Sequence, residues 1–170
     1  MKLAHALVAL VALGLASAPL LVACKSSPSQ GAGEATAEPA SGGSFHEVHL
    51  EPGATPLPEV IAQEQKKARA MGLRLYVELG ATWCKPCKEL EASMSDPRMK
   101  AAFKGTYIVH LDIDAWGGKL ASAKLSSASI PVFFALDAAG KPTGSINGGA
   151  WDANTPANMA PKLAQFFAER

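Results

Sequence analysis

Hydrophobic and polar residues alternate along residues 45–170 with changing periods, which predicts strands separated by helices. The clearest strand is 73–79, LRLYVEL, in which every second side chain is aliphatic. One of its faces is expected to carry Leu73, Leu75, Val77 and Leu79. The opposite face is expected to carry Arg74, Tyr76 and Glu78. This strand therefore predicts a sheet with two chemically different faces.

The remaining pattern predicts an α/β domain with helices on both faces of a central sheet. Further strands are expected at 44–50, 106–113, 131–137 and 143–147. Helices are expected at Pro58–Met71 and around Lys119–Leu125. Another helix is expected to begin at the cysteines and to run to about Ser93. It is expected to break at Asp96-Pro97 and to continue to Phe103. A last helix is expected to start near Asn158, because Pro161 fits poorly in a helix interior, and to pack Leu163, Phe166 and Phe167.

Residues 1–23 differ from the rest, with Lys2 followed by an apolar run that ends in small residues. This composition is typical of an export signal rather than a permanent membrane span. Its end, Leu21-Val22-Ala23-Cys24, resembles the lipobox of bacterial lipoproteins, which implies cleavage before Cys24 and lipid attached to that cysteine. We therefore expect a protein anchored in a bacterial cell envelope and facing the periplasm. Lys25, where inner-membrane retention uses Asp, favours the outer membrane. An ordinary signal peptide with an incidental cysteine is the alternative.

Residues 24–44 are expected to be the lipidated N-terminus and a flexible tether, since Lys25–Ser44 contains no aromatic or branched apolar residue. Residues 45–170 then form one domain of ordinary size. The chain carries a formal net charge of +1, and loss of Lys2 with the signal brings it to zero. A neutral domain lacks the basic surface that nucleic-acid binding needs, so we expect no nucleic-acid partner.

Two of the three cysteines remain for chemistry, Cys84 and Cys87 in ATWCKPCKEL, where a predicted strand gives way to a helix. A helix N-terminus favours the thiolate of Cys84 and makes it a nucleophile. Cys87 lies about one turn later, within reach of a mixed disulfide on Cys84, and is the expected resolving thiol. A structural disulfide is one alternative, although so short a loop constrains the unfolded chain little. A zinc site that also uses His46 and His49 is another.

The motif WCKPCK, followed later by SIPVFFALDAAGK, resembles the thioredoxin superfamily over about residues 57–168. The stretch WCKPCKELEASMSDPRMKAAF is most similar to the thioredoxin-like domains of DsbD-type bacterial thiol reductases. The resemblance implies a thioredoxin-like fold with a central mixed sheet, a monomer without cofactor or metal, protein disulfide substrates and an upstream thiol donor. It favours reduction of protein disulfides. A disulfide oxidant and a non-catalytic binding or assembly module are the alternatives.

The resemblance also implies roles for residues around the cysteines. Pro131, after Ile130, would be a cis-proline against the dithiol, or else a proline that merely starts a strand. Trp83 would be a surface tryptophan that shields the site, or else a core aromatic. Lys85 stands where thioredoxin has Gly; its charge would favour the neighbouring thiolate, or it is simply solvated. Pro86 fits the first helical turn and makes the dithiol loop rigid.

Two further positions match the proton-exchange region of the superfamily. Glu78 precedes Cys84 by six residues, where thioredoxin has a buried acid that exchanges protons with the resolving cysteine. An outward-facing strand glutamate is the alternative. His110 lies in the next strand, where thioredoxin has a lysine close to that acid, so it can pair with Glu78 or be a satisfied core histidine.

Overall fold

The structure is a computed structural model that describes residues 44–169. The predicted signal peptide, Cys24 and almost all of the predicted tether lie outside the described residues and stay predictions. Within residues 44–169, none of the helices combines the length and the hydropathy that a membrane span needs.

Five strands form a single sheet in the described part of the chain: β1 (His46–His49), β2 (Arg74–Gly80), β3 (Thr106–Asp112), β4 (Val132–Leu136) and β5 (Pro142–Asn147). Their order across the sheet is β1-β3-β2-β4-β5. The first three strands are parallel, whereas β4 runs antiparallel to β2 and β5 antiparallel to β4. The sheet is therefore mixed, as predicted.

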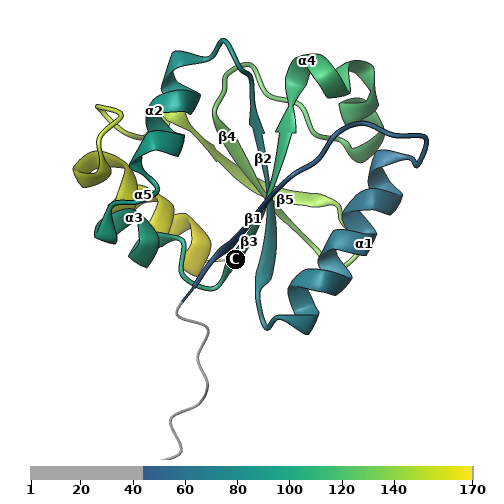
Figure 1. The fold of residues 1–170 in the computed structure, drawn as a ribbon, viewed down its shortest axis with the longest axis horizontal. Helices are drawn as coiled ribbons and strands as arrows, with labels where there is room; N and C mark the ends of the chain where they lie inside the picture. Colours follow the sequence, from purple (N-terminus) through teal and green to yellow (C-terminus); the bar gives the residue numbers. More distant parts are fainter. Residues whose placement is uncertain (1–43, 170) are drawn as a thin grey trace, which may run out of the picture. The chain divides into compact units, whose positions relative to one another are not determined.

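Helices cover both faces of this sheet. They are α1 (Leu57–Ala70), α2 (Lys85–Ser93), α3 (Pro97–Ala102), α4 (Ile113–Trp116) and α5 (Pro156–Ala168), with 3₁₀ helices η1 (Gly117–Ala123) and η2 (Gly148–Ala150). Figure 1 shows α1 and α4 on one side of the sheet and α2, α3 and α5 on the other. The α/β class predicted from the sequence is confirmed.

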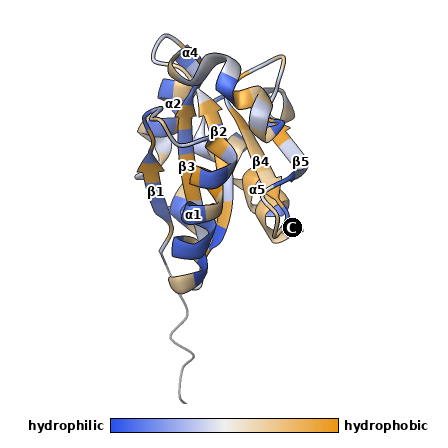
Figure 2. Cartoon of the chain, turned by 90° about the vertical axis from the view of Figure 1, so that its right-hand side faces the viewer, coloured by the Kyte–Doolittle hydropathy of each residue, from blue (hydrophilic) through white to orange (hydrophobic). Residues whose placement is uncertain are grey.

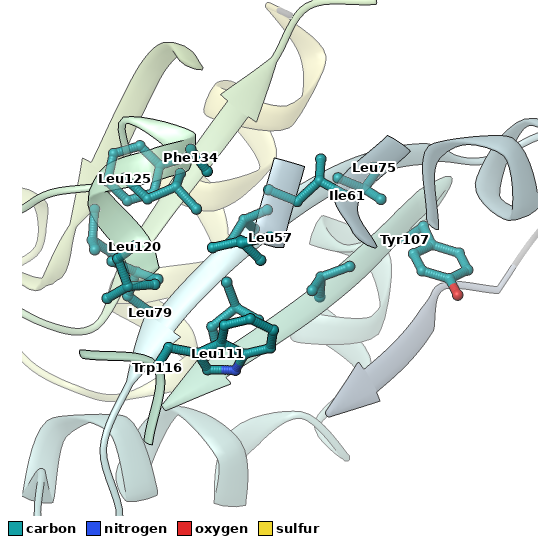
Figure 3. Packing of buried hydrophobic residues seen from close by; sticks show 14 of the residues in the cluster. Leu57, Ile61, Leu75, Leu79, Tyr107, Leu111, Trp116, Leu120, Leu125 and Phe134 are labelled. Carbon is teal, nitrogen blue, oxygen red and sulfur yellow. The ribbon is translucent and has the colours of Figure 1, made fainter. Parts of the chain in front are cut away.

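The alternation in β2 divides the interior into two cores, one on each face of the sheet. Leu75, Val77 and Leu79 pack toward α1 against Leu57 and Ile61, and Figure 3 shows several of these side chains converging. Figure 2 shows α1, largely hydrophilic on its outer surface, in front of hydrophobic central strands. One face of β2 is thus aliphatic along its length, which leaves the other face to carry polar chemistry.

The second core lies under α2, α3 and α5. The rings of Phe103, Phe133 and Phe167 form a triangle with centroid separations of 5.7, 5.0 and 5.7 Å. Tyr76, from the second face of β2, joins this core, and its hydroxyl donates to the backbone carbonyl of Phe167. Glu78 points to the same face. Helix α2 therefore rests, through Leu90, on an aromatic layer beside one carboxylate.

Two predicted helix boundaries are wrong. The last helix begins at Pro156 and contains Pro161 within it. Pro161 and Ala157, whose carbonyl loses its hydrogen bond, are both exposed residues. The proline costs about 3 kcal/mol, which is outweighed by burial on the inner side of the helix at about 1.5–3 kcal/mol for each large apolar side chain. The side chains buried there are Met159, Ala160, Leu163, Phe166 and Phe167.

The other difference lies after β3. The helix predicted at Lys119–Leu125 is a 3₁₀ helix, Gly117–Ala123, and α4 precedes it. Asp112 explains the extra helix, because its Oδ1 accepts hydrogen bonds from the amides of Asp114 and Ala115 and so caps α4. The predicted break between α2 and α3 is confirmed.

Candidate active site

The two cysteines lie where β2 gives way to α2. Cys84 is the N-cap of α2, with extended backbone, and its Sγ accepts a hydrogen bond from the Cys87 amide at 3.2 Å. Its own amide donates to the carbonyl of Ala81. The unpaired amides and the positive end of the helix dipole therefore face the Cys84 sulfur and stabilise negative charge on it.

Cys84 and Cys87 form a disulfide, with their Cα atoms 5.3 Å apart. The two residues differ in exposure: Cys84 is only 3% exposed, whereas Cys87 is half-buried. Cys84 Sγ lies 3.9 Å from the carbonyl oxygen of Ile130. The structure thus describes the oxidised site, in which Cys84 as a residue is less exposed than Cys87.

Pro131 lies against this site, directly before β4. The Ile130–Pro131 peptide bond is cis, the conformation that the resemblance implied. The Pro131 carbonyl accepts a hydrogen bond from the amide of Gly148 at 3.0 Å. A Cβ atom on Gly148 would lie 3.5 Å from Cδ of Pro131, an ordinary contact distance, so the chain after β5 packs beside the proline ring.

Trp83 is a surface residue, not a core aromatic: it is 63% exposed. Its indole Nε1 donates to Asp114 Oδ2 at 2.6 Å. The amide of Thr82 donates to Asp112 Oδ2 at 3.2 Å. Because Asp112 also caps α4, the loop before Cys84 is fixed to the end of β3. The sequence offered no signal for this role of the two aspartates beyond their place after a strand.

Lys85 and Pro86 occupy the first turn of α2. The Lys85 side chain is 86% exposed, and its Nζ lies 3.5 Å from Glu89 Oε1, one turn along the helix. An exposed pair of this kind contributes little to stability. This placement matches the solvated-lysine alternative. Pro86 lies where its missing N–H leaves no hydrogen bond unmade.

Glu78 is buried, at 5% exposure, which excludes the outward-facing alternative. Its Oε2 lies 3.1 Å from Nδ1 of His110, the residue beside it in the β2–β3 register. Gly80 separates the carboxylate from the dithiol. A Cβ atom there would lie 3.0 Å from Glu78 Oε1 and 3.6 Å from Cys87 Sγ. The absence of a side chain at Gly80 therefore lets the carboxylate and the Cys87 sulfur share one small space.

His110 has a second carboxylate partner that the sequence did not reveal. Its Nε2 lies 3.1 Å from Glu47 Oε1. The ring of His49 stacks on it at 4.3 Å with an angle of 10° between the planes. Since a carboxylate faces each ring nitrogen, both nitrogens donate and the ring carries a positive charge. Burial lowers the pKa of His110, but the hydrogen bonds and charges of Glu47 and Glu78 outweigh it and raise the pKa to about 9.

A cavity of about 770 Å³ opens beside Cys87. Glu78, Gly80 and His110 line it together with the Cys87 side chain, and Phe103 and Phe133 belong to its apolar part. The cluster of Glu47, His110 and Glu78 therefore borders a space that reaches the resolving cysteine.

His46 and His49, which the zinc alternative needed, contact different side chains. His46 packs against the ring of Tyr107 at 4.8 Å, and His49 stacks on His110. Residues 44–169 contain no group of three or more His, Cys, Asp or Glu side chains arranged to hold a metal ion. The cysteine sulfurs are bonded to each other.

A dithiol between β2 and α2 faces a cis-proline at the start of β4, within a mixed sheet ordered β1-β3-β2-β4-β5. The fold is thioredoxin-like. This assignment rests on the sheet order and on the position of the dithiol in this chain.

No protein-family model and no curated protein matches the chain. Solved structures do match. A disulphide isomerase from Xylella fastidiosa Temecula1 has 20% identity and a TM-score of 0.49, with 71% of this chain and 94% of that chain covered. Trichomonas vaginalis thioredoxin has 21% identity and a TM-score of 0.48, with 72% and 95% covered. Thioredoxin NaTrxh from Nicotiana alata has 17% identity and a TM-score of 0.49, with 74% and 93% covered.

The His110 cluster predicts a pH dependence of stability. The folded pKa of about 9 exceeds the ordinary value of 6.5. The stabilisation, on the order of 3 kcal/mol, is therefore fully present below pH 6.5 and is lost as the pH rises through 9. An NMR titration of the His110 ring should give a pKa well above 6.5, and Glu47→Gln should lower it. A His110 pKa at or below 6.5 in the wild type would contradict the ion-pair assignment.

Proposed function

We propose that this protein is a thiol–disulfide oxidoreductase that reduces protein disulfides through Cys84 and Cys87. The observation that carries the proposal is the Cys84 sulfur at the N-cap of α2, hydrogen-bonded to the Cys87 amide and bonded to the Cys87 sulfur. A dithiol in this position has one stabilised thiolate and a second thiol within bonding distance. These are the two properties that disulfide exchange requires.

In the proposed reaction the reduced Cys84 thiolate attacks one sulfur of a substrate disulfide. The other substrate sulfur leaves as a thiolate, and a mixed disulfide forms on Cys84. Cys87 then attacks the Cys84 sulfur, which releases the second substrate sulfur and forms the Cys84–Cys87 bond. Trp83 and Pro131 border the Cys84 side, where the substrate docks. Two electrons pass from the dithiol to the substrate, and an upstream thiol donor returns them.

Glu78 is proposed to accept the proton that Cys87 must lose before it attacks. The carboxylate is buried and lies beside the same space as Cys87 Sγ, which supports proton transfer between the two groups. His110 is a positioning residue in this scheme: its charged hydrogen bond holds Glu78 in place and compensates its buried charge.

The reducing direction rests on the resemblance to DsbD-type domains. A disulfide oxidant would use the same two cysteines with the opposite electron flow. A non-catalytic binding or assembly module would keep the pair oxidised and would transfer no electrons. Catalysis of insulin reduction by dithiothreitol separates an enzyme from such a module.

Substitution of single cysteines tests the two roles. Cys87→Ser leaves the nucleophile but removes the resolving thiol, so it should accumulate mixed disulfides with substrate proteins. Cys84→Ser should trap little, because it lacks the stabilised thiolate. Both variants should reduce insulin at least about a hundredfold more slowly than the wild type. Non-reducing electrophoresis and mass spectrometry measure the trapped species, and equal trapping by both variants would show that the assignment is wrong.

The domain is also proposed to be anchored in the bacterial cell envelope by lipid on Cys24, facing the periplasm as a monomer. The Leu21-Val22-Ala23-Cys24 sequence supports the anchor, and Lys25 supports the outer membrane. About twenty tether residues would let the domain reach partners roughly 25 Å from the anchor on average.

Cys24→Ala should release the protein from the membrane fraction, because it removes the site of lipid attachment. Its insulin reductase activity should equal that of the wild type, since residues 25–44 separate the anchor from the dithiol. Membrane fractionation with detection by antibody measures the release. Retention of the variant in the membrane fraction would rule out this anchor.

A further inference from the structure

The two sulfurs of the disulfide face different surroundings. Cys84, at 3% exposure, lies beside Ile130 and follows the exposed Trp83. Cys87 is half-buried and lines the cavity of about 770 Å³, whose walls do not include Cys84, Trp83 or Pro131. Of the two cysteines, Cys87 alone lines this cavity, whose wall also includes Asp114, the hydrogen-bond partner of Trp83.

The size and lining of the cavity suit a small molecule. Cavities that bind small ligands span roughly 300–1,000 Å³, combining apolar walls with a few polar groups. Leu90, Met94 and Phe103 supply apolar wall here. The volume is too small for a folded protein. A short aliphatic molecule can lie along this wall with one end at Cys87.

The charge of the lining is strongly negative. Two cations, Lys88 and the protonated His110, face six carboxylates: Glu47, Glu51, Glu78, Glu91, Asp112 and Asp114. Such an excess of one sign raises the local concentration of small ions of the opposite sign and repels anions. A cationic molecule is therefore favoured in the cavity over an anionic one.

The chemistry of the disulfide favours attack on Cys87, the cysteine that lines the cavity. In thiol–disulfide exchange the sulfur that leaves most readily is the one whose thiolate is most stable. The amino end of α2 and the Cys87 amide stabilise the thiolate of Cys84. Attack on Cys87 expels the Cys84 thiolate. Attack on Cys84 expels the Cys87 thiolate, which lies inside the first turn and lacks the N-cap hydrogen bond. The position of the cavity and leaving-group stability thus select the same sulfur.

We propose that small cationic thiols reduce the disulfide by attacking Cys87 through this cavity. The proposal rests on the proposed function, for which it supplies the class of electron donor. The donor thiolate bonds to Cys87 Sγ, the Cys84–Cys87 bond breaks, and Cys84 leaves as a thiolate. A second donor thiolate then attacks the donor sulfur of the mixed disulfide. This releases an oxidised donor disulfide and the Cys87 thiolate, which takes up a proton. Two donor thiols supply the two electrons.

The test compares three thiols of similar size on the oxidised full-length protein: cysteamine (cationic), 2-mercaptoethanol (neutral) and 2-mercaptoethanesulfonate (anionic). Each rate constant for reduction of the protein is expressed per thiolate. It is then divided by the rate constant of the same thiol with a neutral reference disulfide, 2-hydroxyethyl disulfide. At low ionic strength the normalised rate for cysteamine should exceed that for the sulfonate by about tenfold. At 1 M salt, where the Debye length is about 3 Å, this ratio should fall toward one.

Acid quenching at the earliest times, followed by alkylation and peptide mass spectrometry, locates the adduct. The proposal predicts the cysteamine adduct on Cys87 and an alkylated, free Cys84. An adduct chiefly on Cys84, or normalised rates that do not depend on thiol charge, would overturn it.

Charge reversal provides a matched pair of variants. Glu51→Lys with Glu91→Lys reverses two exposed carboxylates of the cavity wall, and should reduce the preference for cysteamine at least threefold. Glu59→Lys with Glu169→Lys makes the same change in net charge at exposed sites outside the cavity, and should preserve the preference. An equal effect of both pairs would show that net charge, and not the cavity, sets the preference, and would overturn the proposal.

Insulin reduction by the same preparation separates this proposal from the proposed function. If insulin is reduced but the adduct forms on Cys84, the cavity route is wrong and the enzyme assignment holds. If the adduct forms on Cys87 without insulin reduction, the cavity route holds and protein disulfides are not the substrate.

Discussion

The buried Glu78 carboxylate needs a positively charged partner. Protonated His110 is that partner, through the hydrogen bond between the two side chains. The bond links neighbouring positions of the parallel strands β2 and β3, so the sheet register sets its geometry. Glu47 extends the ion pair to the sheet edge, and Gly80 leaves room for the carboxylate to approach Cys87. An unpaired carboxylate here would be costly to bury. The polar half of the site therefore depends on this one interaction.

The two cysteines become chemically different because of what faces each of them. Cys84 meets the amides at the start of α2, which stabilise its thiolate. Cys87 meets a carboxylate cluster and a cavity of about 770 Å³. In the reactions we propose, a single dithiol exchanges with two kinds of partner: a protein disulfide at Cys84 during substrate reduction, and a small thiol at Cys87 during recovery. The helix dipole contributes to both reactions, first by stabilising a nucleophile and then by stabilising a leaving group.

The sequence predicted those features that depend on local pattern. Strict alternation in one strand indicated which way Glu78 points, and the strand-to-helix transition placed Cys84 at a helix start. Glu47 was missed because its partner is 63 residues away, and only the parallel pairing of β1 with β3 brings it to His110. The start of α5 was predicted wrongly for the opposite reason. Pro161 does disfavour a helix interior locally, but the burial of five other side chains of α5 outweighs this preference. Tertiary packing decided both cases.

Transfer of the Cys87 proton to Glu78 is tested most directly by the release of a chromogenic thiol from a preformed mixed disulfide on Cys84. In the wild type this release measures attack by Cys87. Glu78→Gln keeps the shape but removes the proton acceptor, so release should slow at least about tenfold at pH 7 and should gain a steeper dependence on pH between 6 and 9. Equal release rates for the two proteins at every pH would contradict the role of Glu78.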